Sequence, residues 1–413
     1  MKVVIIAGGK GTRIASINSE IPKAMISVNG KPVLEYQIEL AKRYGYVDIW
    51  LVIGHLGDKI RRYFNDGSQW GVNIHYYEEN MPLGTAGALA DLKEVMDDDF
   101  FVFYGDTVMD IALDQMYDFH RQHGADATLL LHPNDHPNDS DLVELGEGDE
   151  ILCFYPKPHS ELFTYRNLVN AALYILSPSI ISNVPKGEKS DFGKHVFPKA
   201  LKAGLKIYGY ISPEYIKDMG TPDRYEKVCS DMKSGKVARM NRKYPRSAIF
   251  LDRDGVISKE VNLLHSLEQL ELIEGAAEAI RYINQKGFLA IIVTNQPVIA
   301  RNLCSIEELR NIHEKLETLL GKEHAYLDAI YYCPHHPDSG YPEEYKIKCD
   351  CRKPNPGMIF RAAKDWNIDL STSYMIGDRE SDKMAGINAG VKESVLISQN
   401  KPYALLNSLI KLI

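Results

Sequence analysis

Two aspartates beyond the middle of the chain could act on a phosphate group. Asp252 and Asp254 stand two residues apart in AIFLDRDGVI, directly after an apolar run that is typical of a buried strand. At an extended end this spacing points both carboxylates to the same side, towards one phosphate and one cation. By itself the pair is also compatible with a calcium loop or a turn.

Later segments add the other groups that hydrolysis of a phosphate monoester requires. Such a reaction needs a nucleophile, an acid for the leaving alkoxide, a fixed cation and Mg2+. The further candidates are Thr294 at the end of FLAIIVTN, Lys353 after CDCR, and Asp378 and Asp382 in MIGDRESD. We expect all of them at strand ends of one sheet, and the set favours a phosphatase over a calcium loop.

Cysteine and histidine residues gather between residues 333 and 351. Four of them form a Cys3His set that suits tetrahedral zinc: Cys333, His335, Cys349 and Cys351. His336 is a competing imidazole, and unmetallated surface cysteines are the alternative to a metal site. Because four protein ligands leave no open position, we expect a structural zinc whose loop fixes where Arg352 and Lys353 point.

A glycine-rich turn near the N-terminus could hold a polyphosphate. It follows the apolar run KVVIIA, and its glycines let backbone N–H groups approach phosphate oxygens closely. The candidate residues are Gly8, Gly9, Gly11, Thr12, Arg13 and, in IPKAM, Lys23. Two cations in this set can converge on one polyphosphate, as phosphoryl transfer requires. The alternative is a tight turn between a strand and a helix.

Two more aspartates could bind Mg2+ in the same half of the chain. Asp106 ends FFVFYGD, and Asp218 lies in IKDMGTPDRY, both at expected strand ends. Two carboxylates at the C-terminal edge of one sheet suit an octahedral Mg2+ that also takes phosphate oxygens. Either aspartate alone would more often be a helix cap or a turn residue.

Alternating strand and helix patterns must position these groups. The segments DIWLVIG, VNIHYYE, FFVFYGD and ATLLLH are expected strands of the first half, and FLAIIVTN, AIYYCP, SYMIGD and ESVLIS of the second. Amphipathic stretches such as VLEYQIELAKRYG and IEELRNIHEKLETLL separate them, which predicts an α/β fold with a parallel sheet in each half. Periodicity is lost over residues 231–246, so we expect two doubly wound domains, 1–232 and 247–413, joined by a linker over 233–246.

The composition is that of a globular protein. The chain has 413 residues, 45% of them hydrophobic and 25% charged, with a net charge of −8 and no run of Lys or Arg. This disfavours long electrostatic contacts with nucleic acid or an anionic membrane, and the apolar runs are shorter than the roughly 20 residues that cross a bilayer. We expect a cytoplasmic protein with small-molecule partners; the sequence gives no prediction of its oligomeric state.

Residues 1 to about 230 resemble the sugar-1-phosphate nucleotidylyltransferases. The segments AGGKGTR, PK, PLGTAGAL, YGD, VNAALYIL and KDMGTP occur in the order of that family. The resemblance implies that the glycine turn with Arg13 and Lys23 holds a nucleoside triphosphate and that Asp106 and Asp218 hold Mg2+. It further implies a base pocket lined by Gly84, Thr85 and Gly87 and a sugar site with Lys157 and Asn170. A sugar 1-phosphate would attack the α-phosphorus and release pyrophosphate.

Two positions depart from that family, and one residue bears on the base. The family's Glu-Lys-Pro is Pro-Lys-Pro at 156–158, and the glycine of its Asn-x-Gly-x-Tyr is Ala172. Glu79 stands five residues before Gly84, where relatives that use thymidine triphosphate carry Gln. A carboxylate accepts hydrogen bonds from guanine N1–H and N2–H2, so Glu79 favours GTP. The alternative is an exposed residue beside Glu78.

Residues 247 to about 400 resemble the haloacid-dehalogenase (HAD) superfamily of phosphatases through the four motifs named above. The resemblance implies that Asp252 is the nucleophile that becomes an aspartyl phosphate and that Asp254 is the general acid and then the base. It implies that Thr294 donates to the phosphate and that Lys353 is the fixed cation. Mg2+ would be held by Asp252, the backbone carbonyl of Asp254 and Asp378, with Asp382 orienting the site.

The zinc loop resembles a branch of that superfamily that contains the heptose 1,7-bisphosphate 7-phosphatases and the histidinol-phosphate phosphatases. TNQPVIARN is similar to the heptose branch's TNQSGIARG and keeps Asn295 and Arg301, whereas Pro297, Val298 and Asn302 depart from it. The branch favours His335 as the zinc ligand. Asn295, Arg301 and Arg352 become candidates for substrate binding, the two arginines for a distal phosphate. Surface arginines are the alternative.

The two resemblances together imply consecutive reactions. Removal of the 7-phosphate from a heptose 1,7-bisphosphate leaves a 1-phosphate, which is what a sugar nucleotidylyltransferase uses, so the expected product is GDP-D-glycero-α-D-manno-heptose. Two alternatives stay open: another nucleotide sugar such as GDP-mannose with a phosphatase for a different monoester such as histidinol phosphate, or one half as a non-catalytic binding module.

Overall fold

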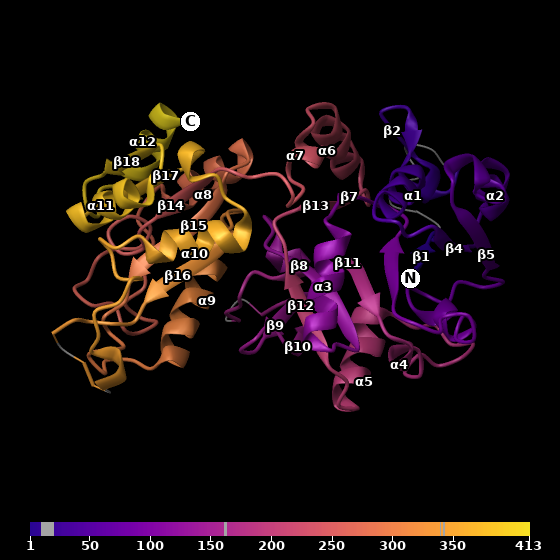
Figure 1. Cartoon of the computed structure of the whole chain (residues 1–413), viewed down its shortest axis with the longest axis horizontal. Coiled ribbons are helices and arrows are strands. Elements are labelled where there is room, and N and C mark those ends of the chain that lie inside the picture. Colours follow the sequence, from indigo (N-terminus) through magenta and orange to yellow (C-terminus); the bar gives the residue numbers. More distant parts are fainter. Residues whose placement is uncertain (10–19, 161–162, 339, 342) are drawn as a thin grey trace. The chain divides into compact units, whose positions relative to one another are not determined.

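The fold divides into two compact units. The computed structural model describes residues 1–9, 20–160, 163–338, 340–341 and 343–413, so the predicted phosphate-binding residues Gly11, Thr12 and Arg13 lie outside the described residues. The first unit comprises residues 1–131, 143–156 and 170–242, and the second residues 132–142, 157–169 and 243–413 (Figure 1). The predicted domain boundaries stay a prediction.

The first unit contains a mixed sheet. Nine strands form it in the described part of the chain: β1 (Lys2–Ile6), β4 (Asp48–Ile53), β5 (Asn73–Glu78), β6 (Phe100–Tyr104), β8 (Ala127–His132), β9 (Leu142–Leu145), β10 (Ile151–Tyr155), β11 (Val169–Leu176) and β12 (Ile207–Ile211). β1 pairs in parallel with β4 and β6, but β11 pairs antiparallel with β6. The expectation of a parallel sheet in this half was therefore wrong, because β11 pairs antiparallel with both β6 and β9.

The helices of the first unit pack against its strands through their apolar faces. They are α1 (Val33–Arg43), α2 (Gly57–Phe64), α3 (Leu113–His123), α4 (Pro178–Ile181), α5 (Phe197–Lys202), α6 (Pro222–Lys233) and α7 (Lys236–Arg239). In α1 the buried Leu34 and Ile38 pack in one core with Val3 and Ile5 of β1. This packing fixes the strand whose end carries the glycine turn.

Two small antiparallel ribbons complete the first unit. β2 (Ser27–Val28) pairs with β3 (Lys31–Pro32), and β7 (Thr107–Asp110) pairs with β13 (Tyr215–Asp218). Asp218 lies opposite Thr107, and the Met219 N–H donates to the Asp106 carbonyl at 3.0 Å. The two aspartates are therefore neighbours, but the expected edge of a single sheet was wrong: a separate ribbon brings Asp218 beside the end of β6.

The segment predicted as a linker is largely attached to its neighbours. Val237 of α7 is buried, the Arg242 N–H donates to Glu214 Oε1 at 2.8 Å, and Asn241 Nδ2 donates to Asp110 Oδ1 at 2.8 Å. In the second unit the Arg246 N–H donates to the Asn367 carbonyl at 3.0 Å. The chain is thus anchored up to Arg242 and again from Arg246.

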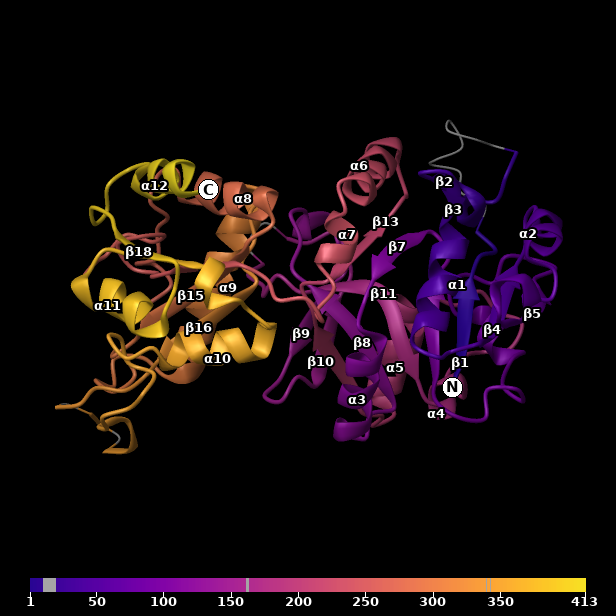
Figure 2. The same ribbon diagram turned by 45° about the horizontal axis from the view of Figure 1, so that its top comes forward.

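The second unit contains a parallel sheet, as predicted. Five strands form it among the described residues in the order β16 (Ala329–Cys333), β15 (Leu289–Asn295), β14 (Ala248–Leu251), β17 (Tyr374–Gly377) and β18 (Glu393–Leu396). The helices are α8 (Ala276–Lys286), α9 (Ile306–Lys322), α10 (Gly357–Trp366), α11 (Glu380–Ala389) and α12 (Ala404–Leu412). Figure 2 shows α8 beside α12, which pack against each other. A capping box of Ser305 and Glu308 begins α9.

Two segments from the first half of the sequence belong to this second unit. In residues 157–169, the Tyr165 N–H donates to Thr318 Oγ1 at 3.0 Å and the Asn167 N–H to Glu317 Oε2 at 2.8 Å. Both acceptors are on α9. The contact therefore joins residues about 150 positions apart in the sequence.

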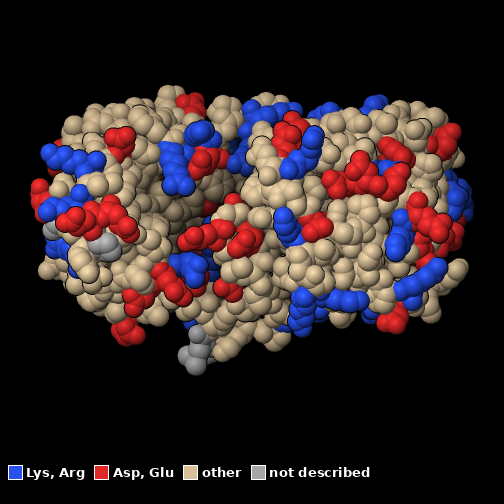
Figure 3. Space-filling model, turned by 60° about the horizontal axis from the view of Figure 1, so that its bottom comes forward, with Lys and Arg blue, Asp and Glu red and all other residues tan. Residues whose placement is uncertain are grey.

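The charge distribution on the surface and the hydropathy of the helices are relevant to possible binding partners. Lysine and arginine side chains alternate with aspartate and glutamate over the face drawn in Figure 3. None of the helices in the described part of the chain is long and apolar enough to cross a membrane.

Candidate active sites

The end of β14 carries the predicted nucleophile beside a buried lysine. Lys353 Nζ lies 2.9 Å from Asp252 Oδ1 and 2.6 Å from Asp382 Oδ1, and the Lys353 side chain is 2% exposed. We expected Lys353 at a strand end, but it lies in the loop before α10. Asn295 at the end of β15 fixes that loop, because its Oδ1 accepts from the Lys353 N–H and its Nδ2 donates to the Lys353 carbonyl, at 3.0 and 3.1 Å.

Burial sets the protonation of this cluster. It raises the pKa of Asp252 to about 6, although Lys353 opposes the shift. Burial also disfavours the charged form of Lys353, but the carboxylates of Asp252 and Asp382 outweigh this and raise the lysine pKa. Near neutral pH the cluster therefore holds an ionised aspartate against a protonated lysine, which suits a nucleophile beside a fixed cation.

Three carboxylates at this edge could hold a divalent cation. One oxygen each of Asp252, Asp378 and Asp382 lies within 4.8 Å of the others. Asp378 Oδ1 is buried and, among the described residues, lacks a hydrogen-bond partner, whereas Asp378 Oδ2 accepts from Gln399 Nε2 at 2.6 Å. A buried carboxylate oxygen without a donor is suited to a hard cation, so the residues fit Mg2+.

A glycine is required beside these carboxylates. Gly255 has φ +85°, and a Cβ on it would lie 2.4 Å from Asp378 Oδ2. Both the left-handed backbone and the close approach exclude larger residues. Gly255 therefore keeps the Asp378 carboxylate against the turn that follows Asp254.

The carboxylate of Asp254 is not a member of this metal-binding group. Its oxygens accept from Arg253 Nε at 2.9 Å, Arg253 Nη2 at 2.8 Å, Gln296 Nε2 at 2.9 Å and Ser258 Oγ at 2.9 Å. Burial would raise the pKa of Asp254, but these donors, Arg253 foremost, hold it below its usual value. What remains for a metal is the Asp254 backbone carbonyl that the resemblance implies.

Sequence reasoning missed Arg253 and Gln296. Arg253 lies between two aspartates and would ordinarily be read as an exposed residue, yet it is fully buried. Gln296 is 2% exposed, and its Nε2 also donates to Thr294 Oγ1 at 3.0 Å, which links the predicted phosphate donor to Asp254. The signal that could have found them is their position directly beside two motif residues.

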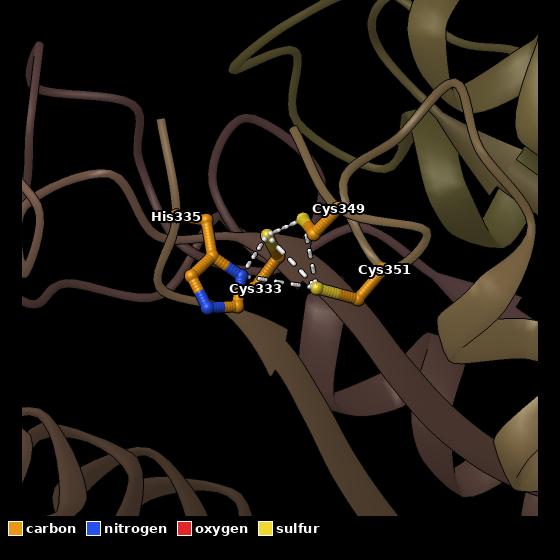
Figure 4. Close-up of side chains that lie close together, drawn as sticks. All are labelled: Cys333, His335, Cys349 and Cys351. Carbon is orange, nitrogen blue, oxygen red and sulfur yellow. Dashed lines mark hydrogen bonds between the residues drawn. The ribbon is translucent and has the colours of Figure 1, made fainter. Parts of the chain in front are cut away.

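The Cys3His residues converge as predicted (Figure 4). Sulfur to sulfur distances are 3.5 Å for Cys333 to Cys349, 3.2 Å for Cys351 to Cys333 and 3.1 Å for Cys351 to Cys349. His335 Nδ1 lies 3.3 Å from Cys351 Sγ and 3.7 Å from Cys333 Sγ. All four donor atoms lie within 4.8 Å of one another, which fits a tetrahedral zinc with Zn–S bonds of about 2.3 Å.

The competing histidine faces elsewhere. His336 Nδ1 accepts from the Asp338 N–H at 3.2 Å, and the His336 N–H donates to the Tyr345 carbonyl. Burial, together with the charges of Arg352 and Arg301, lowers the pKa of His336. The two predicted phosphate-binding arginines thus both act on one imidazole, while Arg352 Nη1 also donates to the His335 carbonyl at 3.0 Å.

In the first unit, Glu79 lies against the glycine turn. A Cβ on Gly8 would come within 2.4 Å of Glu79 Oε2, so only glycine permits this approach. Glu79 Oε1 accepts from the Leu83 N–H at 3.2 Å, and burial raises the pKa of Glu79. Glu78 is exposed but Glu79 is half-buried, which contradicts the alternative that Glu79 is an exposed surface residue.

The predicted base pocket is built against residues 188–192. A Cβ on Gly84 would meet the Ser190 carbonyl at 2.4 Å, and one on Gly87 would meet the Glu188 carbonyl at 2.8 Å. Thr85 Oγ1 donates to Asp191 Oδ2 at 2.9 Å and accepts from the Phe192 N–H at 3.1 Å. The Thr85 side chain therefore shapes the pocket wall.

The charged candidates of the first half that the structure describes are paired with protein groups. Lys23 contacts Asp106, and Arg224 Nη1 lies 2.9 Å from Asp218 Oδ1. Lys157, which is in the second unit, donates to the Asp139 carbonyl at 2.7 Å. Gly9 has open space at its Cα, and Asn170 Oδ1 accepts from the Ala172 N–H at 3.2 Å.

Comparison with known proteins supports the predicted nucleotidyl transferase in the N-terminal part of the chain. The nucleotidyl transferase family matches residues 2–235 of the 413. A UTP--glucose-1-phosphate uridylyltransferase of Synechocystis sp. is 34% identical over 243 residues, which are 55% of this chain and 62% of that protein. A Bacillus anthracis structure, provisionally assigned as a glucose-1-phosphate thymidylyltransferase, aligns over 56% of this chain and 94% of its own, with a TM-score of 0.50. At 19% identity it shows the fold alone.

The C-terminal part matches phosphatases. A HAD-hydrolase-like family matches residues 350–402. The D-glycero-beta-D-manno-heptose-1,7-bisphosphate 7-phosphatase of Pasteurella multocida is 41% identical over 157 residues, which are 38% of this chain and 84% of that protein. The chain therefore belongs to the nucleotidyl transferase family and is a bifunctional enzyme that also carries a HAD-like phosphatase domain homologous to the heptose-1,7-bisphosphate 7-phosphatases.

Proposed function

We propose that this enzyme hydrolyses the 7-phosphate of D-glycero-D-manno-heptose 1,7-bisphosphate and transfers GMP from GTP to the resulting heptose 1-phosphate. The observation that carries the proposal is the homology to 7-phosphatases in a chain whose other part is a nucleotidyl transferase. The first reaction leaves the 1-phosphate that the second needs. Both reactions use phosphorylated metabolites, which fits the expected cytoplasmic location.

In the phosphatase reaction, Asp252 attacks the phosphorus. The bond from its carboxylate oxygen to phosphorus forms and the bond to the sugar oxygen breaks. The leaving alkoxide takes a proton through Asp254, whose ionised carboxylate first accepts that proton from the monoanionic substrate phosphate. A water molecule then gives its proton to Asp254 and attacks the aspartyl phosphate, which releases phosphate and regenerates Asp252.

Other residues prepare that reaction. Lys353 stabilises the ionised nucleophile, Thr294 donates to a phosphate oxygen, and Asn295 holds the Lys353 loop. A Mg2+ ion held by Asp252, the Asp254 backbone carbonyl and Asp378 would offset the phosphate charge when bound, and Asp382, paired with Lys353, orients the site. Arg301 and Arg352, beside His336, would bind the phosphate that stays on the sugar.

In the transferase reaction, the 1-phosphate oxygen attacks the α-phosphorus of GTP and pyrophosphate leaves. We assign phosphate binding to Gly8, Gly9, Gly11, Thr12, Arg13 and Lys23. Asp106 and Asp218, brought side by side by the β7 and β13 ribbon, would hold Mg2+. Lys157 and Asn170 would bind the sugar phosphate and the sugar.

Glu79 supports guanine as the base. An ionised carboxylate accepts the two neighbouring N–H groups of guanine, and Gly8 lets that carboxylate lie against the nucleotide turn. Because burial raises the Glu79 pKa, acidification should protonate it above the usual carboxyl range. The KM for GTP should therefore rise as the pH falls from about 8 to about 5, while that of a Glu79→Gln variant stays flat.

One incubation tests the whole proposal. The enzyme is given heptose 1,7-bisphosphate, GTP and Mg2+, and phosphate, pyrophosphate and nucleotide sugar are measured together. Appearance of all three is expected. Phosphate without pyrophosphate would restrict the proposal to the C-terminal part, and faster pyrophosphate release with UTP and glucose 1-phosphate would favour the activity named for the Synechocystis relative. Histidinol phosphate serves as the competing phosphatase substrate.

A further inference from the structure

The buried guanidinium of Arg253 connects the predicted general acid, Asp254, to helix α9. Its Nε and Nη2 donate to the two oxygens of Asp254, Nη2 also donates to Gln296 Oε1 at 3.0 Å, and Nη1 lies 3.2 Å from His313 Nε2. The Arg253 side chain is 0% exposed. Such a bidentate contact fixes the plane of a carboxylate, and lysine cannot reproduce it.

His313 is the third support of this guanidinium. An arginine can only donate hydrogen bonds, so the contact requires His313 Nε2 to be the unprotonated acceptor. Burial, together with the charge of Arg253, lowers the pKa of His313 to about 3, which keeps the imidazole neutral. The buried positive charge therefore faces one carboxylate, that of Asp254, and two neutral acceptors, Gln296 and His313.

The hydrogen-bond network of Arg253 includes both the predicted nucleophile and the predicted general acid. The Arg253 backbone N–H donates to Asp252 Oδ1 at 2.8 Å, while its side chain holds Asp254. Gln296 extends the same network to Thr294. A fully buried arginine is costly to desolvate, and replacing such a group by apolar residues is often neutral for stability. The presence of a buried arginine here is explained more directly by the orientation of Asp254 than by stability.

We propose that Arg253, supported by His313, is a positioning residue that orients the Asp254 carboxyl group for proton exchange with the leaving alkoxide and the attacking water. This inference rests on the proposed role of Asp254. The effect of replacing Arg253 on the rate should depend on the leaving group. An alkoxide needs a proton as its bond to phosphorus breaks, whereas a nitrophenolate leaves with little need of protonation.

The test compares two substrates across matched variants. Arg253→Lys keeps the charge but loses the planar fork, and Asp254→Asn is the reference for loss of the acid. Arg379→Lys is the control, since Arg379 also adjoins a site aspartate but pairs with Glu260 and is 58% exposed. For each variant kcat and KM are measured with heptose 1,7-bisphosphate and with p-nitrophenyl phosphate.

Arg253→Lys should lower kcat for the sugar phosphate by about 10²-fold, within the usual range of general acid catalysis, and change the aryl phosphate rate much less. KM should change little for both substrates, and the control should keep the wild-type ratio of rates. Equal losses with both substrates would show a merely structural role and overturn the inference.

Asp254→Asn separates this inference from the function beneath it. If that variant shifts the ratio and Arg253→Lys does not, only the inference fails. If Asp254→Asn leaves the ratio unchanged, the acid assignment fails and the inference fails with it. Should Arg253→Lys not fold, His313→Leu decides: it should shift the ratio in the same direction, and His313→Gln, which keeps an acceptor, should restore it. An unshifted ratio in a folded His313→Leu enzyme would overturn the proposal.

Discussion

Both candidate sites pair a lysine with an aspartate, but at different depths. In the phosphatase the Lys353 side chain is 2% exposed and its partners Asp252 and Asp382 are 10% and 1% exposed. In the transferase Lys23 is 14% and Asp106 28% exposed. Charges in the first site are fixed before substrate arrives, whereas those in the second can exchange a protein partner for a ligand.

The difference follows from what each reaction must exclude. An aspartyl phosphate is formed in a covalent step, so the nucleophile and its cation benefit from a dry, rigid setting. A nucleotidyl transfer instead has to admit and release a large, charged nucleotide. The phosphatase therefore depends on buried pairs, and the transferase on groups that a ligand can recruit.

The largest expected effect is loss of the buried nucleophile. Asp252→Asn should lower phosphatase kcat on the order of 10⁴-fold, as removal of a catalytic nucleophile does, and leave pyrophosphate release by the transferase unchanged. Rapid-quench assays of both activities in one preparation measure this. Asp365→Asn, on the exposed side of α10, is the control. Full phosphatase activity in Asp252→Asn would disprove the covalent assignment.

Removal of zinc should affect one unit. The binding free energy of a structural zinc is on the order of 10 kcal/mol, so chelation should release the loop that carries Arg352 and Lys353 and abolish most phosphatase activity. Transferase activity, measured with excess Mg2+, should change little, and added zinc should restore the phosphatase.

Cys349→Ser should mimic the chelated enzyme, whereas Cys304→Ala, at a buried cysteine outside the metal cluster, should not. The metal content of each variant is measured by atomic emission. A phosphatase that keeps its rate without zinc would contradict the view of the loop as a structural clamp.

Lys353 and Lys23 should differ in how much their loss destabilises the protein. Lys353→Met leaves Asp252 and Asp382 buried without their cation and should cost about 3–5 kcal/mol in the free energy of unfolding, as broken buried pairs do. Lys23→Met should cost less, about 0–1 kcal/mol, because the pair of Lys23 with Asp106 is only partly buried and water screens it. Hydrogen exchange of β14 and β1 amides without added Mg2+ reports each unit separately. Equal costs would remove the contrast drawn between the sites.

The smallest effect concerns backbone strain at the two sites. The phosphatase has glycine at its left-handed position, Gly255, whereas the transferase has Ala172 at φ +58°. Ala172→Gly should therefore stabilise the protein by up to about 1 kcal/mol, since the left-handed conformation costs a non-glycine residue about that much. Ala171→Gly, at a position outside the left-handed residues, should instead destabilise it by about 0.5–1 kcal/mol. Urea unfolding measures both.

Local patterns predicted the elements but not the tertiary details of the sites. The apolar runs before Asp252 and Asp106 show the periodicity of strands, which can be read from a single sequence. The spacing of the Cys3His set likewise shows its ligand chemistry directly. The antiparallel pairing of β11, and the ribbon that brings Asp218 to Asp106, depend on contacts between distant segments. Arg253 was missed because burial of an arginine is a tertiary property: its position between two motif aspartates marks it as a candidate but does not show that it is buried.

The attachment of residues 157–169 to α9 limits how the gene for this enzyme could be divided. Tyr165 and Asn167 are 5% and 2% exposed, and their N–H groups find acceptors on Thr318 and Glu317. A cut after Arg242 would place donors and acceptors on different polypeptides and leave buried amides unsatisfied. The two activities are thus encoded one after the other, but their coding regions cannot be separated cleanly. A domain exchange between related fusion enzymes has to transfer residues 157–169 together with α9.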